Sequence, residues 1–280
     1  MSYQRIGISP LSGTFGAELS GVDLSKPLDD ETFAEIRRAW LDYKVIFFRD
    51  QHLTPEQHRD FGGRFGDFQK PGFVPVLKDY PEIRRQEVKL GGVSQDIWWH
   101  TDDAFLDIPS KGSVLYALKV PDAGGDTVWA NMAAAYDALS DQMQNFLGGL
   151  TAIHDVSFRN ALSAIDKWGP EHYKNVRASV PPVEHPVIRT HPETGRKSIF
   201  VTEQLTSHMK GMTAKESEAL LKFLFSHTQQ EEFLCRFKWR DHSVAFWDNR
   251  CTQHRGIFDF SADAYRLMHR VAIADSARPV

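Results

Sequence analysis

The sequence FLCRFKWR at residues 233–240 carries the clearest strand pattern in the chain. Apolar side chains occupy every second position, at Phe233, Cys235, Phe237 and Trp239, and the positions between them are mostly charged. Because successive side chains of a strand point to opposite faces, this alternation predicts a strand with one face in the core and the other largely in solvent.

Further short segments are rich in β-branched or aromatic residues and are bounded by turn residues, which favours strands. They cover residues 45–48, 113–120, 198–203, 243–247 and 266–274. Several short strands with helices at the periphery predict a mainly β fold with a jelly-roll core.

The predicted helices begin with recognisable caps or follow a periodic apolar pattern. Residues 30–43 place apolar side chains at steps of three and four, which predicts an amphipathic helix. Thr54 with Gln57 forms a capping-box pattern that opens a second helix, and Thr213 opens a third in the same way. Residues 132–146, rich in Ala, Leu and Met, predict helix with a break near Ser140.

The composition favours one domain without a nucleic-acid or membrane partner. The chain has 280 residues, is 41% hydrophobic and shows no repeat or linker, so we expect a single domain over residues 1–280. A formal net charge of −4 gives no basic field for nucleic acid or anionic lipid. The N-terminal residues do not resemble a signal peptide, and no apolar run is long enough to span a bilayer, so we expect a cytoplasmic protein. Cys235 and Cys251 are expected to be reduced and buried.

His100 and Asp102 are a candidate pair of metal ligands. In an extended backbone, side chains two residues apart leave on the same face, so this pair can bind one ion. His254, which follows a strand-like segment, is the candidate for the third ligand. Two imidazoles and a carboxylate on one face of an octahedron leave three positions open, as in non-haem iron(II) oxygenases. The alternative is a surface loop, because His-x-Asp pairs arise by chance in a chain with 12 His and 37 acidic residues.

Arg266 and Arg270 lie on one predicted strand close to His254 in the sequence. Their separation of four residues is even, so both side chains point to the same face. An arginine offers a planar fork suited to a carboxylate, and two of them on an inward face indicate paired anion sites near a metal. The alternative is a solvated basic face balanced by surface acids such as Asp263.

Longer motifs spread over most of the chain resemble one family, the taurine dioxygenase and dichlorophenoxyacetate dioxygenase (TauD/TfdA) family, and occur in the family's order. They are WHTDDAF (99–105), GGDTVWANMAAAYDALS (124–140), HPVIRTHPETGRKSIFV (185–201), WDNRCTQH (247–254) and RLMHRVAI (266–273). Residues 15–28 (FGAELSGVDLSKPL) and 215–225 (KESEALLKFLF) also resemble that family.

The resemblance implies an Fe(II)- and 2-oxoglutarate-dependent dioxygenase with a double-stranded β-helix. It implies that His100, Asp102 and His254 bind the iron, and that Thr127 and Arg266 hold the far carboxylate of 2-oxoglutarate. Arg270 is implied to meet the anionic group of the primary substrate. Such enzymes use O2, release succinate and CO2, and hydroxylate small organic anions such as alkyl sulfonates, sulfate esters, and aryloxy or alkyl carboxylic acids. Relatives commonly form dimers or tetramers, so the resemblance also implies a homo-oligomer.

Two departures from the family's taurine branch concern the substrate. That branch carries a His and a Tyr in the segment that reads FGDFQKPGF (65–73) here, where the His is absent and Phe73 has no hydroxyl. An asparagine of that branch is also replaced, within Gln95-Asp96-Ile97. We therefore expect a larger organic acid in place of taurine.

An apolar wall suits the body of such a substrate. Trp98, Phe158 and Leu205, together with Phe105, are the candidates, and core packing is the alternative for these side chains. Lys70 and Arg159 are expected to lie on the surface.

Two other functions are compatible with parts of this pattern. A zinc hydrolase can use the same three ligands with a metal-bound water, but no further His or Glu has a hydrolase spacing. A jelly roll can also be a non-catalytic metal- or ligand-binding protein. The presence of all three ligands together with Thr127 and Arg266 favours the dioxygenase.

Overall fold

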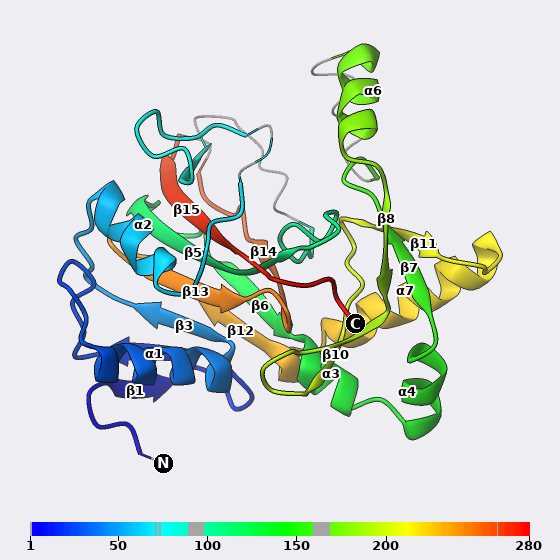
Figure 1. The fold of residues 1–280 in the computed structure, drawn as a ribbon, viewed down its shortest axis with the longest axis horizontal. Coiled ribbons are helices and arrows are strands. Elements are labelled where there is room, and N and C mark those ends of the chain that lie inside the picture. Colours follow the sequence, from blue (N-terminus) through cyan, green and yellow to red (C-terminus); the bar gives the residue numbers. More distant parts are fainter. Residues whose placement is uncertain (1, 71, 73, 89–97, 159–168, 262) are drawn as a thin grey trace.

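The described residues form two facing sheets, of which the larger contains seven strands. The computed structural model describes residues 2–70, 72, 74–88, 98–158, 169–261 and 263–280 (Figure 1). All neighbouring strands of this sheet are antiparallel, except that β2 (Ala17–Ser20) and β3 (Val45–Phe48) are parallel. In spatial order the strands are β1 (Gly7–Pro10), β2 (Ala17–Ser20), β3 (Val45–Phe48), β13 (Val244–Asp248), β5 (Ser110–Lys119), β15 (Arg266–Ala274) and β4 (Arg84–Val88).

The smaller facing sheet has the order β12 (Leu234–Phe237), β6 (Thr127–Asn131) and β14 (Thr252–Gly256), and all its pairs are antiparallel. His100 extends it by a single bridge to His254 on β14. Two further small sheets lie beside it. They contain β7 (Thr151–His154), β8 (Val183–Pro186) and β11 (Thr206–Met209), and the pair β9 (Ile188–Thr190) and β10 (Lys197–Ile199).

The core between the two main sheets decides which way the site residues point. Leu115 and Met268 from the larger sheet pack there with Trp129 from the smaller one. Val271, three positions after Met268, belongs instead to the cluster beneath the outer helices. Even-numbered residues in the first half of β15, near Met268, therefore face the space between the sheets, as expected for a jelly roll.

Helices cover the outer surfaces of this sandwich (Figure 1). α1 (Asp30–Tyr43) and α2 (Pro55–Gly63) pack on the larger sheet through an apolar cluster that includes Trp40 and Phe246. The remaining helices lie toward the small sheets, where α6 (Pro170–Ser179) extends away from the body (Figure 1). They are α3 (Met132–Asp137), α4 (Asp141–Leu147), α6 (Pro170–Ser179), α7 (Ala214–Thr228) and the 3-10 turn η1 (Glu231–Phe233).

The helix predictions are confirmed, including the break at Ser140, whose hydroxyl accepts the Met143 amide hydrogen bond that opens α4. Thr54 and Gln57 form the predicted capping box, as do Thr213 and Glu216.

Two strand predictions are too long. In FLCRFKWR only Leu234–Phe237 is strand, although the side chains at 233, 235, 237 and 239 are all buried as predicted. The predicted strand 198–203 ends at Ile199, because the Thr202 hydroxyl accepts a hydrogen bond from the Leu205 amide and the chain turns. Within the described residues no helix is long and apolar enough to cross a membrane.

Two fully buried histidines make stability depend on pH. Burial lowers the pKa of His58 and of His154 to about 3, from an unfolded value near 6.5. The unfolded chain binds more protons below pH 6.5, so the stabilisation is complete above that pH and is lost as pH falls toward 3. At pH 5 each histidine is expected to lower the free energy of unfolding by about 2 kcal/mol relative to pH 7.5.

Urea unfolding of the metal-free protein at both pH values measures this loss. His58→Gln, which does not titrate, is expected to show a smaller difference between the two pH values. An equal difference in the variant would show that His58 does not contribute to the pH dependence of stability.

Candidate active site

His100, Asp102 and His254 come together in the structure. Their ligand atoms all lie within 4.8 Å of one another, and the three residues are buried. The His100 Nε2 atom lies 4.0 Å from Asp102 Oδ1, and the two imidazole centroids are 4.3 Å apart. The sequence therefore identified a real cluster, and the surface-loop alternative is wrong for these side chains.

Backbone pairing between His100 and His254 builds the cluster. Each amide donates to the carbonyl of the other residue, at 3.0 and 2.8 Å. The Thr101 hydroxyl donates to the Thr252 carbonyl at 3.0 Å and fastens the same segment to β14. The expectation of an extended backbone through Asp102 is wrong, because the strand-like pairing stops at His100 and a turn begins at Asp102. This turn brings the carboxylate to the imidazoles.

His100 is oriented for metal binding by its second ring nitrogen. Its Nδ1 donates to the Trp98 carbonyl at 2.8 Å, so the neutral ring carries its lone pair on Nε2. That nitrogen is the one near Asp102.

Asp102 is held by contacts to both carboxylate oxygens. Its Oδ2 accepts a hydrogen bond from the Ser113 hydroxyl at 2.7 Å, and its Oδ1 pairs with the guanidinium of Arg270. Burial raises the pKa of Asp102, but the positive charge of Arg270 and the neighbouring histidines outweigh burial and place this pKa below its usual range. The side chain is thus ionised, as a metal ligand must be.

This donor set fits iron(II). Two imidazoles and one ionised carboxylate match the facial arrangement of non-haem iron oxygenases. A second cluster, His191, Asp248 and Cys251, does not fit a metal. There the candidate ligand atoms are bonded to each other, because His191 Nε2 lies 3.0 Å from Asp248 Oδ2, and the Arg250 guanidinium bridges both oxygens of Asp248. In the first cluster the corresponding atoms, His100 Nε2 and Asp102 Oδ1, are 4.0 Å apart.

Thr127 and Arg266 lie on neighbouring parts of the two sheets. Thr127 opens β6 opposite Gly256 of β14, and Gly256 lies against the ring of Phe258. The Arg266 guanidinium carbon lies 5.9 Å from the centroid of the same ring. Both Thr127 and Arg266 are buried.

The hydroxyl of Thr127 has a defined direction. Trp239 Nε1 donates to Thr127 Oγ1 at 2.9 Å. Because an indole nitrogen only donates, the threonine oxygen is the acceptor, and its own hydrogen remains available for an incoming acceptor. A carboxylate is such an acceptor.

The residues predicted to contact the substrate divide into buried and exposed ones. Arg270 is 8% exposed beside Asp102, and Leu205 is 4% exposed in a cluster with Ala104 and Phe200, against which Phe105 packs. Trp98 and Phe158 are 37% and 44% exposed, so they lie at the surface of the protein.

Other residues of the sequence argument lie at the surface or outside the described part. Lys70 is exposed, as predicted. Phe73, Gln95-Asp96-Ile97 and Arg159 lie outside the described residues.

The supporting residues Ser113 and Asn249 were missed by the sequence reasoning. Asn249 lies within the WDNRCTQH motif, which was used for His254 alone, and its amide reaches the Ser113 hydroxyl at 3.3 Å. No local pattern marks Ser113, which is one of many small residues on strands.

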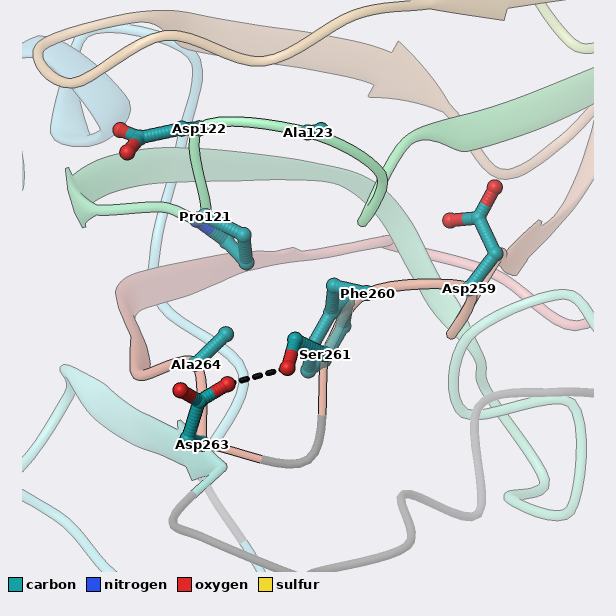
Figure 2. Close-up of a pocket in the computed structure, with 8 residues that line it drawn as sticks. All are labelled: Pro121, Asp122, Ala123, Asp259, Phe260, Ser261, Asp263 and Ala264. Atoms are coloured by element: carbon teal, nitrogen blue, oxygen red, sulfur yellow. Dashed lines mark hydrogen bonds between the residues drawn. The ribbon is translucent and has the colours of Figure 1, made fainter.

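A cavity of about 430 Å3 opens between the turn at residues 121–123 and the loop that joins β14 to β15 (Figure 2). Its lining residues include Asp122, Asp259 and Asp263 and none of the predicted site residues. An acidic lining repels organic anions, which disfavours this cavity as the substrate site. Asp259 accepts a hydrogen bond from the Gly125 amide at 2.9 Å and fastens the loop to the turn that precedes Thr127.

Comparisons with known proteins agree with the motifs. A family model described as taurine catabolism dioxygenase TauD, TfdA family, matches residues 7–272. The chain is 33% identical over 274 residues to an alpha-ketoglutarate-dependent sulfate ester dioxygenase of Pseudomonas putida, covering 96% of this chain and 90% of the relative. It is 34% identical over 288 residues to the alpha-ketoglutarate-dependent 2,4-dichlorophenoxyacetate dioxygenase of Cupriavidus pinatubonensis, covering 96% and 98%.

A solved structure shows the same fold. The crystal structure of AAD-2 in complex with Mn(II) and N-oxalylglycine has a TM-score of 0.85 and 31% identity, and the alignment covers 99% of this chain and 100% of that one. The resemblance read from the motifs is confirmed, and neither the zinc hydrolase nor the non-catalytic alternative is supported. The chain belongs to the TauD/TfdA family of alpha-ketoglutarate-dependent dioxygenases.

Proposed function

We propose that this dioxygenase hydroxylates a small organic anion with an apolar body, such as a sulfate ester or an aryloxy carboxylic acid. The observation that carries the proposal is the position of Arg270, which is buried and paired with Asp102. An anionic group held by this guanidinium would lie next to the metal ligands. The names of two relatives specify a sulfate ester and dichlorophenoxyacetate as substrates, and alkyl sulfonates carry the same kind of charge.

His100, Asp102 and His254 would hold the iron(II). When bound, iron(II) with 2-oxoglutarate and dioxygen supplies the oxidation of a substrate C–H bond, with release of succinate and CO2. The chain contributes the ionised carboxylate of Asp102 and the His100 ring, whose tautomer is fixed by the Trp98 carbonyl. Both features support tight binding of a divalent ion.

Thr127 and Arg266 would hold the far carboxylate of 2-oxoglutarate. The guanidinium supplies charge and two parallel donors, and the threonine supplies one more through the hydrogen that Trp239 leaves available. Because both side chains come from strands of the two facing sheets, the co-substrate would be positioned by the rigid core rather than by a loop.

The apolar cluster around Leu205 would lie along the substrate body and exclude water from it. The cluster connects directly to the metal segment, because Ala104 follows Asp102 by two residues. Trp98 and Phe158 would contribute at the rim, in keeping with their exposure. The substitution of Phe73 for a tyrosine removes a hydroxyl that the taurine branch uses, which supports a larger acid over taurine.

A substrate panel tests the proposal. Purified protein is supplied with iron(II), 2-oxoglutarate, ascorbate and one of several sulfate esters, aryloxy acids or sulfonates, and succinate is measured. We expect a sulfate ester or aryloxy acid to stimulate succinate formation and taurine to leave it at background. Arg270→Leu is expected to remove this stimulation, whereas Lys70→Leu, which changes an exposed cation, is expected to retain it. Stimulation by taurine alone would contradict the proposal.

The expected single domain, homo-oligomer and cytoplasmic location remain predictions. Size-exclusion chromatography with light scattering measures the subunit number.

A further inference from the structure

A chain of hydrogen bonds lies behind Asp102 in the core. Trp247 Nε1 donates to Asn249 Oδ1 at 2.9 Å. Asn249 Nδ2 donates to the Ser113 hydroxyl oxygen at 3.3 Å and to the Ser110 hydroxyl oxygen at 3.1 Å. The Ser113 hydroxyl donates to Asp102 Oδ2 at 2.7 Å. All five residues are at most 6% exposed, so water does not compete for these bonds.

The direction of every hydrogen bond in this series is fixed by its two end residues, Trp247 and Asp102. An indole nitrogen only donates, so the amide oxygen of Asn249 must face Trp247 and the amide nitrogen must face the serines. The Ser113 oxygen therefore accepts from Asn249, and its hydrogen points to the ionised carboxylate of Asp102, which only accepts. No reversed arrangement satisfies both Trp247 and Asp102.

The strand pairing of β5 and β13 holds this series of hydrogen bonds in place. Ser113 lies opposite Trp247 in the antiparallel register, and the backbone amide of Asn249 donates to the Lys111 carbonyl at 3.0 Å. The Ser113 hydroxyl is thus part of the rigid sheet, and the position of Asp102 Oδ2 is defined by it.

We propose that Ser113, oriented by Asn249, makes Asp102 bind the metal through one carboxylate oxygen only. Oδ2 accepts the hydrogen bond of the Ser113 hydroxyl inside the core, whereas Oδ1 lies near His100 Nε2 and pairs with Arg270, the residue proposed above to hold the substrate anion. A carboxylate that bound through both oxygens would take one of the three positions that a facial triad leaves open. Ser113 and Asn249 are therefore positioning residues that keep that position available for co-substrate or dioxygen. This inference rests on the metal site proposed above.

Water-proton relaxation of the Mn(II)-loaded protein, measured without 2-oxoglutarate, tests the inference independently of turnover. Mn(II) is added to saturation, with the free ion monitored by electron paramagnetic resonance, so that a change in affinity does not affect the result. With one-oxygen binding, three coordination positions hold exchangeable water, and with two-oxygen binding only two do. Ser113→Ala is expected to lower the relaxation enhancement by roughly one-third.

Ser110→Ala is the matched control, because it removes the other hydroxyl that accepts from Asn249 and leaves the bond to Asp102 intact. It is expected to keep the wild-type enhancement. Asn249→Asp, which cannot donate to Ser113, is expected to behave like Ser113→Ala and provides a second route if that variant is poorly folded. An unchanged enhancement in Ser113→Ala, or an equal loss in Ser110→Ala, would overturn the inference. A wild-type protein that binds no Mn(II) would instead overturn the proposed metal site.

Discussion

Asp102→Ala is expected to abolish iron binding and, with it, 2-oxoglutarate turnover. Asp102 supplies the only carboxylate in the buried cluster and pairs with Arg270. Without it, two imidazoles must bind a divalent ion beside an uncompensated guanidinium. Loss of a residue that merely supports a ligand already costs about 10- to 100-fold in metal affinity, so loss of the ligand is expected to cost more. The readout is the weak visible charge-transfer band of the anaerobic protein with iron(II) and 2-oxoglutarate, which should disappear.

Arg270→Leu separates the two roles of Asp102. If Asp102 mattered only as the partner of Arg270, removing either residue would weaken metal binding equally. We expect Arg270→Leu to retain the charge-transfer band and to lose the response to organic anions, because its carboxylate partner stays available for the metal. A band that persists in Asp102→Ala would show that the carboxylate is not a ligand.

The helices were predictable because their signals are local. Thr54 and Gln57 bond to each other across one turn, at 2.8 and 3.2 Å, so four residues of sequence contain the whole cap. Strand ends were less predictable, since a strand ends where its partner or a side chain draws the backbone away. Thr202 does so by turning the chain toward Leu205.

The candidate ligands of the site could be predicted from the sequence, but the residues that hold them in place could not. His100, Asp102 and His254 were predicted as ligands from their residue types and from the family motifs, and the structure brings the three side chains together. Ser113 was not, because its role depends on Asn249, which is 136 residues away in the sequence. The turn that begins at Asp102 was also missed, since the rule for strands describes His100 and does not extend past it. Residue type, spacing and the family motifs predicted the three candidate ligands, and the fold shows which contacts hold these side chains.

Arg266→Ala is expected to raise the 2-oxoglutarate concentration needed for half-maximal activity far more than the substrate concentration. Truncating one partner of a buried, charge-assisted pair typically costs about 2–5 kcal/mol, which corresponds to a factor of roughly 30 or more. Thr127→Val removes one neutral donor and Trp239→Phe only its orientation, so each is expected to raise the requirement by about 2- to 10-fold. Arg255→Ala, which removes an arginine that lies over Trp99, serves as the control and is expected to leave the requirement unchanged.

A co-substrate without the far carboxylate distinguishes a direct contact from general damage. 2-Oxobutyrate keeps the keto acid that binds the metal and lacks the group that Arg266 is proposed to hold. If the contact is direct, the wild type discriminates strongly between the two keto acids, and Arg266→Ala removes most of that discrimination while affecting 2-oxobutyrate little. Trp239→Phe should reduce the discrimination in the wild type and leave it unchanged in a Thr127→Val background, because the indole acts only through the hydroxyl it orients. Equal losses for both keto acids would place Arg266 among the residues that merely stabilise the fold.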